Sequence, residues 1–286
     1  MLADCLGLPE VPAPTELLGA ARVRALLAKH GIRPSRALGQ NFVIDPNTIR
    51  KTLAIADLGS NERVLEIGPG AGSLTVALAG AADSVVAVEY DERLVGLLQE
   101  VLGPHANVEI VHEDARELDF STAVATALVA NLPYNIAASM VLKTLEQAPS
   151  IRTLTVMTQK EAGERLAASS GSKSYGITSV LVAYYGAATV AGTVSRRAFW
   201  PVPRVDSVVV RVERGEEPQN VERETFYLVV KAAFSQRRKT LRNSLAQLAG
   251  TVAAAEALLG RAGIDGGRRA ETLEVDDYIA LAKQVS

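Results

Sequence analysis

The feature that most constrains the fold is an alternation of short β-branched runs with helical stretches over residues 63–120 and just beyond. Strands separated by helical stretches pair in parallel, because a parallel connection has to cross the sheet. We therefore expect an α/β fold with a doubly wound, Rossmann-like sheet. The pattern predicts strands at 64–67, 84–89, 108–111 and 127–130, and helices that begin near Ser73, Glu92 and Ala137.

Three further apolar runs follow the alternating region, at residues 153–158, 177–185 and 205–212. The connection between the last two is too short for a crossover helix, so we expect them to form a hairpin at the sheet edge. A charged, proline-containing segment at residues 215–220 then separates this region from a wholly helical pattern. We predict a Rossmann-like domain at 36–214 and a smaller all-helical domain at 221–286.

A helical pattern also precedes the α/β region, within a predicted N-terminal extension of residues 1–35. Apolar side chains at Val23, Leu26 and Leu27 recur with helical spacing. Thr15 is a candidate cap for this helix and Gly31 a candidate stop, since short hydroxyl residues favour helix starts and glycine favours helix ends. The extension is therefore expected to be a helix from Thr15 to His30.

Composition excludes several classes of protein. With Cys5 as its single cysteine, the chain can form neither an intramolecular disulfide nor a multi-cysteine zinc site, and we expect no metal. No apolar run approaches the roughly 18 residues of a membrane span, and the chain starts without a basic region and apolar core. These features predict a cytoplasmic protein that does not bind membranes. Nothing in the sequence demands more than a monomer.

Three glycines, Gly68, Gly70 and Gly72, follow the first predicted strand and open a helix. Glycines at this position let the backbone approach a ligand at the carboxyl edge of the sheet. The spacing G-x-G-x-G brings the third glycine one residue earlier than the dinucleotide fingerprint G-x-G-x-x-G, which binds a pyrophosphate. This difference favours a ligand without phosphates, such as S-adenosylmethionine.

Two carboxylates end the next two predicted strands. Glu89 lies about 20 residues after the glycine loop, where it can accept hydrogen bonds from both hydroxyls of a ribose. Asp114 ends the third strand, from which it can bond an adenine amine. The alternative interpretation is that the glycines form only a tight turn and that both acids are solvated strand ends.

The tetrapeptide Asn131, Leu132, Pro133 and Tyr134 follows the fourth predicted strand, at the same sheet edge as the glycine loop. The exocyclic amine of adenine is a poor nucleophile, and it becomes reactive when acceptors bind its hydrogens. The Asn131 Oδ1 and the Leu132 carbonyl can be these acceptors, and Pro133 preorganises them by fixing φ near −65°. Tyr134 can stack on an extruded base.

No strong general base is required at this loop, because the methylated ammonium product is acidic. The absence of a neighbouring cysteine disfavours methyltransferases that attack carbon through a covalent thiolate. A proline turn without catalytic function remains the alternative.

Charge is distributed unevenly along the chain. The net charge of −2 and the pI near 6.0 are not typical of nucleic-acid binders, whose pI commonly exceeds about 9. However, residues 225–255 contain no Asp or Glu. We predict one helical face with Phe226, Val230, Phe234, Leu241, Leu245 and Leu248, opposite basic groups that bind an RNA backbone. A solvated surface is the alternative. The candidate RNA-binding residues are Lys231, Arg237, Arg238, Lys239 and Arg242.

Together these residues resemble the ribosomal RNA adenine dimethyltransferases, in particular the KsgA/RsmA type that acts on small-subunit (16S) ribosomal RNA. The resemblance spans roughly Arg36 to Leu248. Besides the two loops it includes the segments Leu-Gly-Gln-Asn-Phe at 38–42, Phe-Trp-Pro-Val-Pro-Arg-Val-Asp-Ser at 199–207 and Phe-Ser-Gln-Arg-Arg-Lys-Thr-Leu-Arg-Asn-Ser-Leu at 234–245.

The resemblance implies that Gln40, Asn41 and Val43 join the glycine loop, the two strand-end acids and Asn131 in holding the cofactor. Val43 stands where the family usually has leucine. The resemblance also implies that Phe199 lines the target-base pocket with Tyr134; the alternative is that Phe199 is a core aromatic. For Gln40 and Asn41, the alternative is a role in helix capping or in a turn. Ala137 and Ala138 stand where the family often has Ser-Thr.

By the same resemblance, the chain would dimethylate two adjacent adenines in the 3′-terminal hairpin loop of 16S rRNA, in the small ribosomal subunit or its precursor, and so contribute to subunit biogenesis. Two alternatives remain open. One is a large-subunit (23S) adenine methyltransferase that confers macrolide resistance. The other is a ribosome-assembly factor whose methylation is dispensable.

Overall fold

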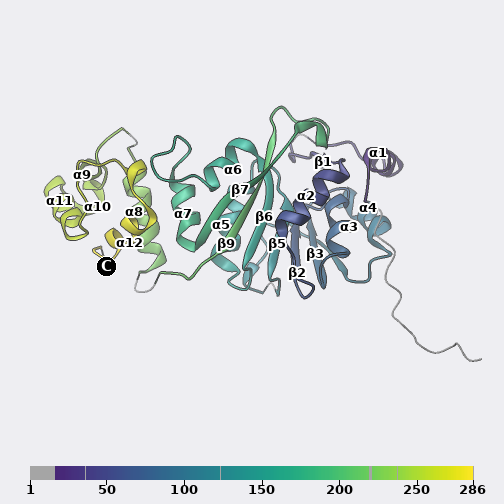
Figure 1. Ribbon diagram of the computed structural model, residues 1–286, viewed down its shortest axis with the longest axis horizontal. Coiled ribbons are helices and arrows are strands. Elements are labelled where there is room, and N and C mark those ends of the chain that lie inside the picture. The colour runs from purple at the N-terminus through teal and green to yellow at the C-terminus, as the bar shows by residue number, and fades with distance from the viewer. Residues whose placement is uncertain (1–16, 36, 123, 219–220, 237, 286) are drawn as a thin grey trace, which may run out of the picture.

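The structure is a computed structural model that describes residues 17–35, 37–122, 124–218, 221–236 and 238–285 (Figure 1). Its main feature is a seven-stranded sheet with the order β4-β3-β2-β5-β6-β9-β7. A small second sheet pairs β1 with β8. The strands are β1 (Phe42–Val43), β2 (Arg63–Ile67), β3 (Ser84–Glu89), β4 (Val108–His112), β5 (Ala127–Asn131), β6 (Thr153–Gln159), β7 (Gly186–Val194), β8 (Phe199–Trp200) and β9 (Ser207–Arg214).

Helices connect the strands and form the C-terminal region. They are α1 (Ala20–Lys29), α2 (Pro46–Ala56), α3 (Ser73–Ala79), α4 (Glu92–Leu102), α5 (Ala137–Gln147), α6 (Lys160–Leu166), α7 (Ile177–Tyr185), α8 (Arg223–Phe234), α9 (Leu241–Ser244), α10 (Ala246–Ala249), α11 (Val252–Arg261) and α12 (Val275–Ala282). Three short 3-10 helices are η1 (Phe120–Thr122), η2 (Arg196–Ala198) and η3 (Ala270–Thr272).

The five strands β4, β3, β2, β5 and β6 run parallel, as the alternation of strands and helices predicted. Alternate residues of each strand face opposite sides of the sheet. Val64 and Val129 pack with α2 and α3 on one face, whereas Leu65 and Leu128 pack with α5 and α7 on the other. Both faces are therefore covered, which explains why the strands are almost wholly apolar.

The predicted edge hairpin is only partly correct. Strand β9 pairs antiparallel with β6 and with β7, so the edge is antiparallel, but β7 spans residues 186–194. Residues 177–185, predicted as a strand, form helix α7. This segment is apolar all round because α7 lies between α5, α6 and α8, and a buried helix and a buried strand cannot be distinguished by periodicity alone. Strand β7 was missed because it is rich in alanine and glycine.

The N-terminal helix α1 is shorter than predicted. It begins at Ala20, with Gly19 at the N-cap, and ends with His30 at the C-cap and Gly31 at a φ of +65°. Thr15, the predicted cap, lies outside the described residues. Helix α1 buries Val23, Leu26 and Leu27 against α4 and Phe42, so the extension is packed onto the sheet domain.

The C-terminal helices form the opposite end of the molecule in Figure 1. Between Arg214 and Arg223 the described residues contain no helix or strand, in agreement with the predicted interruption. The apolar face predicted over residues 226–248 does not belong to one helix, because α8 ends at Phe234 and α9 begins at Leu241. The turn between them lets both helices pack their apolar residues on the same core.

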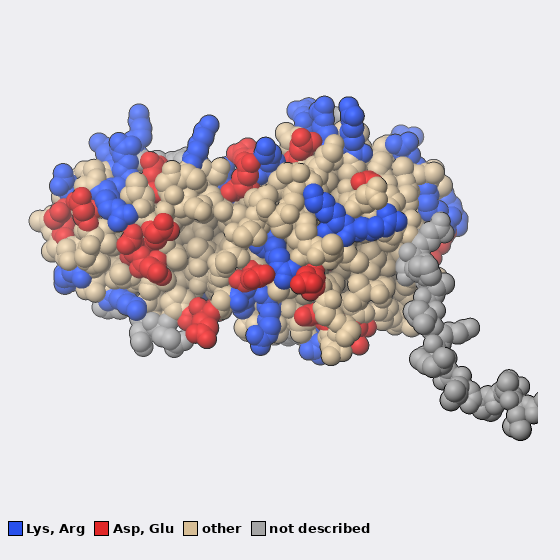
Figure 2. All heavy atoms as spheres, viewed as in Figure 1, with Lys and Arg blue, Asp and Glu red and all other residues tan. Residues whose placement is uncertain are grey.

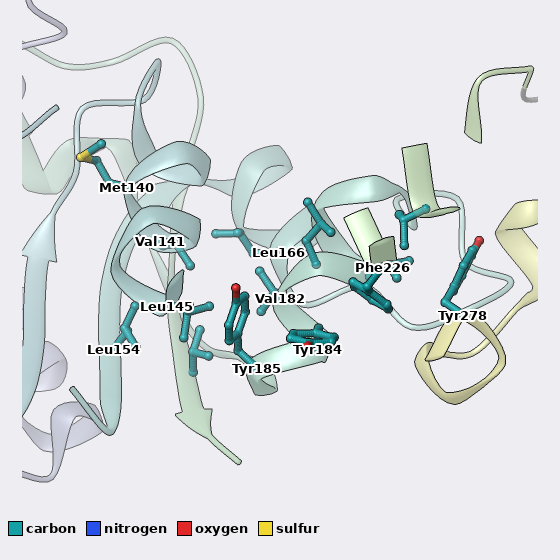
Figure 3. Close-up of a cluster of buried hydrophobic side chains, with 14 of the residues drawn as sticks. Met140, Val141, Leu145, Leu154, Leu166, Val182, Tyr184, Tyr185, Phe226 and Tyr278 are labelled. Carbon is teal, nitrogen blue, oxygen red and sulfur yellow. The ribbon is translucent and has the colours of Figure 1, made fainter. Parts of the chain in front are cut away.

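The helical end shares its core with the sheet domain. In Figure 3 the ring of Phe226 from α8 lies against Tyr184 from α7, with ring centroids 4.3 Å apart. Tyr185 also donates or accepts a 3.1 Å hydrogen bond with the hydroxyl of Tyr227. One continuous buried cluster therefore runs from the sheet into the C-terminal helices.

Candidate methyl-transfer site

A cavity of about 210 Å³ lies at the carboxyl ends of β2, β3, β4 and β5. This is the edge at which doubly wound sheets bind their ligands. Its lining comes from residues 37–43, 66–71, 73–74, 88–91, 94, 113–116 and 131–136. Loops that are far apart in the sequence thus form one pocket.

The glycine loop forms one wall of the cavity. Gly68 and Gly70 have φ angles of +71° and +60°, a region that disfavours other residues. A Cβ at Gly70 would lie 2.9 Å from the ring of Phe42, so a side chain is excluded there. Gly72, at a φ of +82°, does not line the cavity. It caps α3 and lets α3 approach Val101 of α4.

Glu89 ends β3 and holds the glycine loop in place. Its Oε2 accepts a 3.1 Å hydrogen bond from the Gly70 amide, and its Oε1 accepts a 2.9 Å bond from the Asp91 amide. Burial raises the pKa of Glu89, although the two backbone amides oppose that shift. The carboxylate has lone pairs beyond these two bonds, so it can still accept from a ligand.

Asp114 follows β4 and lines the cavity. Arg116 binds it with a 2.6 Å contact from Nη2 to Oδ2 and a 3.0 Å contact from Nε to Oδ1. These bonds lower the pKa of Asp114, so the group is a carboxylate at neutral pH. Arg116 also lines the cavity, and the sequence did not single it out.

The segment before β1 closes the cavity on another side. Gln40 accepts a 2.8 Å hydrogen bond from the Ser35 amide and donates a 2.7 Å bond to the Asp91 Oδ2. Asn41 donates to the Gly39 carbonyl at 3.1 Å. Gln40, Asn41 and Val43 all line the cavity. Gln40 and Asn41 also form hydrogen bonds within this turn, as expected if they had the alternative role of stabilising it.

Three acids in the lining, Glu66, Asp91 and Glu113, were missed by the sequence analysis. Asp91 caps α4 and is bound by Arg93 and Gln40, which together lower its pKa. Glu66 is 1% exposed in β2, and its Oε2 has no hydrogen-bond partner among the described residues. Burial raises the pKa of Glu66 to about 8. A glutamate inside the apolar run Val-Leu-Glu-Ile was the available signal for this site.

The tetrapeptide that begins at the last residue of β5 lines the cavity beside the glycine loop, since a Cβ at Gly68 would lie 3.8 Å from the Pro133 Cδ. Asn131 donates a 3.2 Å hydrogen bond from Nδ2 to the Asn41 carbonyl, while no described residue donates to its Oδ1. The Leu132 amide donates to the Met157 carbonyl at 3.0 Å, which anchors the loop to β6. The hydroxyl of Tyr134 lies 3.1 Å from the Ser207 Oγ. Burial raises the pKa of Tyr134.

Phe199 does not line this cavity. Its side chain is fully buried in a core cluster with Val43, Ile49 and Met157, and its backbone pairs with Val43 in the β1–β8 sheet. The structure therefore favours the alternative interpretation of Phe199 as a core aromatic. Its contact with the cavity is indirect, because Phe199 pairs with Val43 and the next residue, Trp200, pairs with Phe42, and both β1 residues line the cavity.

The described basic residues that were predicted to bind RNA lie in the C-terminal helical end, and none of them lines the cavity. Lys231 is on α8, Arg238 and Lys239 are in the turn after it, and Arg242 is on α9. All four are exposed, and none forms an ion pair within the described residues. Arg237 lies outside the described residues.

Comparison with known proteins agrees with this geometry. The family model for ribosomal RNA adenine dimethylase matches residues 32–286. Ribosomal RNA small subunit methyltransferase A from Nocardia farcinica is 47% identical over 279 residues, which cover 94% of this chain and 95% of that protein. The protein of the same name from Streptomyces coelicolor is 44% identical over 280 residues, which cover 95% and 98%.

Solved structures share this fold over most of the chain. A dimethyladenosine transferase from Plasmodium falciparum superposes with a TM-score of 0.74 at 25% identity, over 83% of this chain and 94% of that one. The 23S rRNA methyltransferase ErmE superposes with a TM-score of 0.66 at 31% identity, over 86% and 99%. Because the family model covers residues 32–286 and relatives are 44–47% identical over nearly the whole chain, the chain belongs to the ribosomal RNA adenine dimethylase family.

Proposed function

We propose that this chain transfers methyl groups from S-adenosylmethionine to the N6 amines of two adjacent adenines in the 3′-terminal hairpin loop of 16S rRNA. The observation that carries the proposal is the position of Asn131. Its Nδ2 is bound to the Asn41 carbonyl, which leaves Oδ1 as an acceptor among the residues that line the cavity beside the glycine loop.

The cavity suits S-adenosylmethionine, which carries a sulfonium and an ammonium and supplies an electrophilic methyl group when bound. Glu89, Asp91 and Asp114 line the cavity, and carboxylates favour cations. Glu89 would accept hydrogen bonds from the ribose, and Asp114 from the adenine amine. No group of three or more His, Cys, Asp or Glu residues that could hold a metal exists among the described residues, and the proposed chemistry needs none.

The loop after β5 would bind the target base. Asn131 Oδ1 and the Leu132 carbonyl would accept the hydrogens of the N6 amine and direct its lone pair toward the cofactor side of the cavity. Tyr134 would stack on the extruded base. The hydrogen bond between the Tyr134 and Ser207 hydroxyls would restrict the orientation of the Tyr134 ring before the base binds.

We also propose that residues 221–286 form an RNA-binding domain. The supporting features are four exposed basic side chains, Lys231, Arg238, Lys239 and Arg242, which form no ion pair with any acid in the described part of the chain. Such charges position an RNA without reading its sequence, because phosphates are the same at every nucleotide. The substrate would be the small subunit or its precursor, bound by a monomer in the cytoplasm. None of the described helices could span a membrane.

The relatives distinguish the main proposal from a large-subunit methyltransferase. Proteins named small subunit methyltransferase A are 44–48% identical to this chain over nearly its whole length, whereas ErmE is 31% identical. An assembly factor without catalysis is disfavoured by the intact Asn131, Glu89 and Tyr134, all of which lie in the cavity.

The test is transfer of labelled methyl groups to small and, separately, to large subunits from cells that lack the modification. Dimethyladenosine in small subunits, and a fall of about 100-fold or more in rate for Asn131→Ala, are the expected results. Label only in large subunits would move the assignment to the resistance enzyme. Tight binding of small subunits without label would support the assembly-factor alternative.

A further inference from the structure

The loop between β7 and β9 carries three basic side chains that the predicted RNA-binding residues do not include. Arg196, Arg197 and Arg204 are exposed, and their side chains form no ion pair or hydrogen bond within the described residues. In Figure 2, Lys and Arg side chains project from the upper edge of the molecule, where Figure 1 shows this loop.

The loop is attached to segments that line the methyl-transfer cavity at its middle and at its C-terminal end. At its middle, Trp200 pairs with Phe42 in β1, and the Ile44 amide donates a 2.8 Å bond to the Ala198 carbonyl. At its C-terminal end, Ser207 forms a hydrogen bond with the hydroxyl of Tyr134. The arginines are therefore held beside the segments that line the cavity and would hold the target base.

The acids near the loop do not neutralise these arginines. Arg196 and Arg204 line a groove of about 520 Å³ together with Lys160, Glu161 and Glu164. Glu161 is bound by Arg165 at 2.9 Å, and Glu164 by Lys160 at 3.8 Å.

Asp206, which also lines the groove, accepts a 2.9 Å hydrogen bond from the backbone amide of Arg196. Its carboxylate is thus directed to the main chain, and the three guanidinium groups remain available for an anion.

We propose that Arg196, Arg197 and Arg204 bind phosphates of the RNA next to the target adenines, as a second contact surface on the sheet domain. This inference rests on the proposed function, since it requires an RNA substrate. A guanidinium binds phosphate oxygens through two hydrogen bonds, and an extruded base needs its flanking backbone fixed. The helical end would then bind a more distant part of the same RNA.

The test compares binding to small subunits over a range of salt concentrations. We expect the triple variant Arg196→Ala, Arg197→Ala, Arg204→Ala to bind at least about tenfold more weakly at 0.1 M salt. The slope of log K against log salt should become shallower by about two to three, because each lost phosphate contact removes nearly one unit. Replacement of the same arginines by lysine should restore most of the slope.

The matched control is the double variant Arg63→Ala, Arg152→Ala. Both residues are exposed at the amino ends of β2 and β6, which is the opposite edge of the sheet. Affinity for S-adenosylmethionine, measured by calorimetry, should be unchanged in every variant, which shows that each is folded.

A triple variant with the affinity and salt slope of the control would overturn the inference while leaving the proposed function intact. A wild-type chain that neither binds nor methylates small subunits would overturn both. A triple variant that loses affinity by the same factor at every salt concentration would also refute phosphate binding, because a lost phosphate contact must change the slope.

Discussion

Glu66 is a buried carboxyl whose protonation is coupled to folding. Its folded-state pKa is about 8, against 4.5 for an ordinary glutamate. Between these two values the folded protein holds a proton at Glu66 that the unfolded chain has released. Its contribution to stability is therefore fully present below pH 4.5 and is lost as the pH rises toward 8.

We expect Glu66→Gln to remove this dependence, because glutamine keeps the shape but does not titrate. The free energy of unfolding of the wild type should fall relative to the variant by up to about 1.4 kcal/mol per pH unit between pH 5 and 8. Urea denaturation at several pH values measures it. If the free energy of unfolding changed with pH in the same way for both proteins, Glu66 would not be protonated in the folded state.

Tyr134 and Ser207 are joined by one hydrogen bond that we expect to orient the ring for stacking. Tyr134→Phe and Ser207→Ala each remove this bond, so each should raise the KM for small subunits several-fold and leave kcat nearly unchanged. The double variant should be no worse than either single one. Tyr134→Ala, which also removes the ring, should cost about tenfold or more. Additive effects of the two single changes would contradict the coupling.

At the scale of elements, helix α6 is held close to β9 by a glycine. A Cβ at Gly163 would lie 2.9 Å from the Val210 Cγ2 and still closer to Val208. Helix α6 follows β6 directly, and its residues Lys160, Glu161 and Glu164 line the groove with Arg196 and Arg204.

Gly163→Ala should lower the free energy of unfolding by roughly 1–3 kcal/mol through overpacking. The matched change is Gly96→Ala on α4, where a Cβ would meet no atom within 4 Å. It should be neutral or stabilising by up to about 1 kcal/mol, because alanine is the better helix former. Chemical denaturation of both variants measures the difference, and equal effects would disprove the contact.

At the scale of the whole molecule, the core is shared between the sheet and the C-terminal helices. Phe226 is 0% exposed and lies against Tyr184, whereas Leu228, two residues further along α8, is 56% exposed. The two halves are therefore expected to stabilise each other, even where they have separate roles in binding.

Phe226→Ala should destabilise the protein by about 3–5 kcal/mol, as loss of a buried aromatic ring does. Leu228→Ala on the same helix should change stability by less than about 0.5 kcal/mol. Thermal unfolding followed by circular dichroism and by the fluorescence of Trp200 should give one coincident transition. Two transitions, of which Phe226→Ala moves one, would show that the halves fold independently.

Much of the fold and site was predictable from the sequence, because the signals are local. Periodicity places the parallel strands and their helices, and the spacing of Gly68, Glu89, Asp114 and Asn131 after successive strands places all four at one sheet edge. Because the carboxyl ends of parallel strands lie at the same edge of the sheet, the order of these residues along the sequence is enough to predict that they line one pocket.

Tertiary structure decided whatever depends on pairing between distant segments. Residues 177–185 are helical because helices surround them, and Phe199 is buried because β8 pairs with β1. The bond from Gln40 to Asp91 and the attachment of the 195–206 loop to the cavity join residues more than 50 positions apart. No local sequence pattern predicts such contacts, because they stabilise the protein only after the sheet has brought segments that are distant in the sequence together.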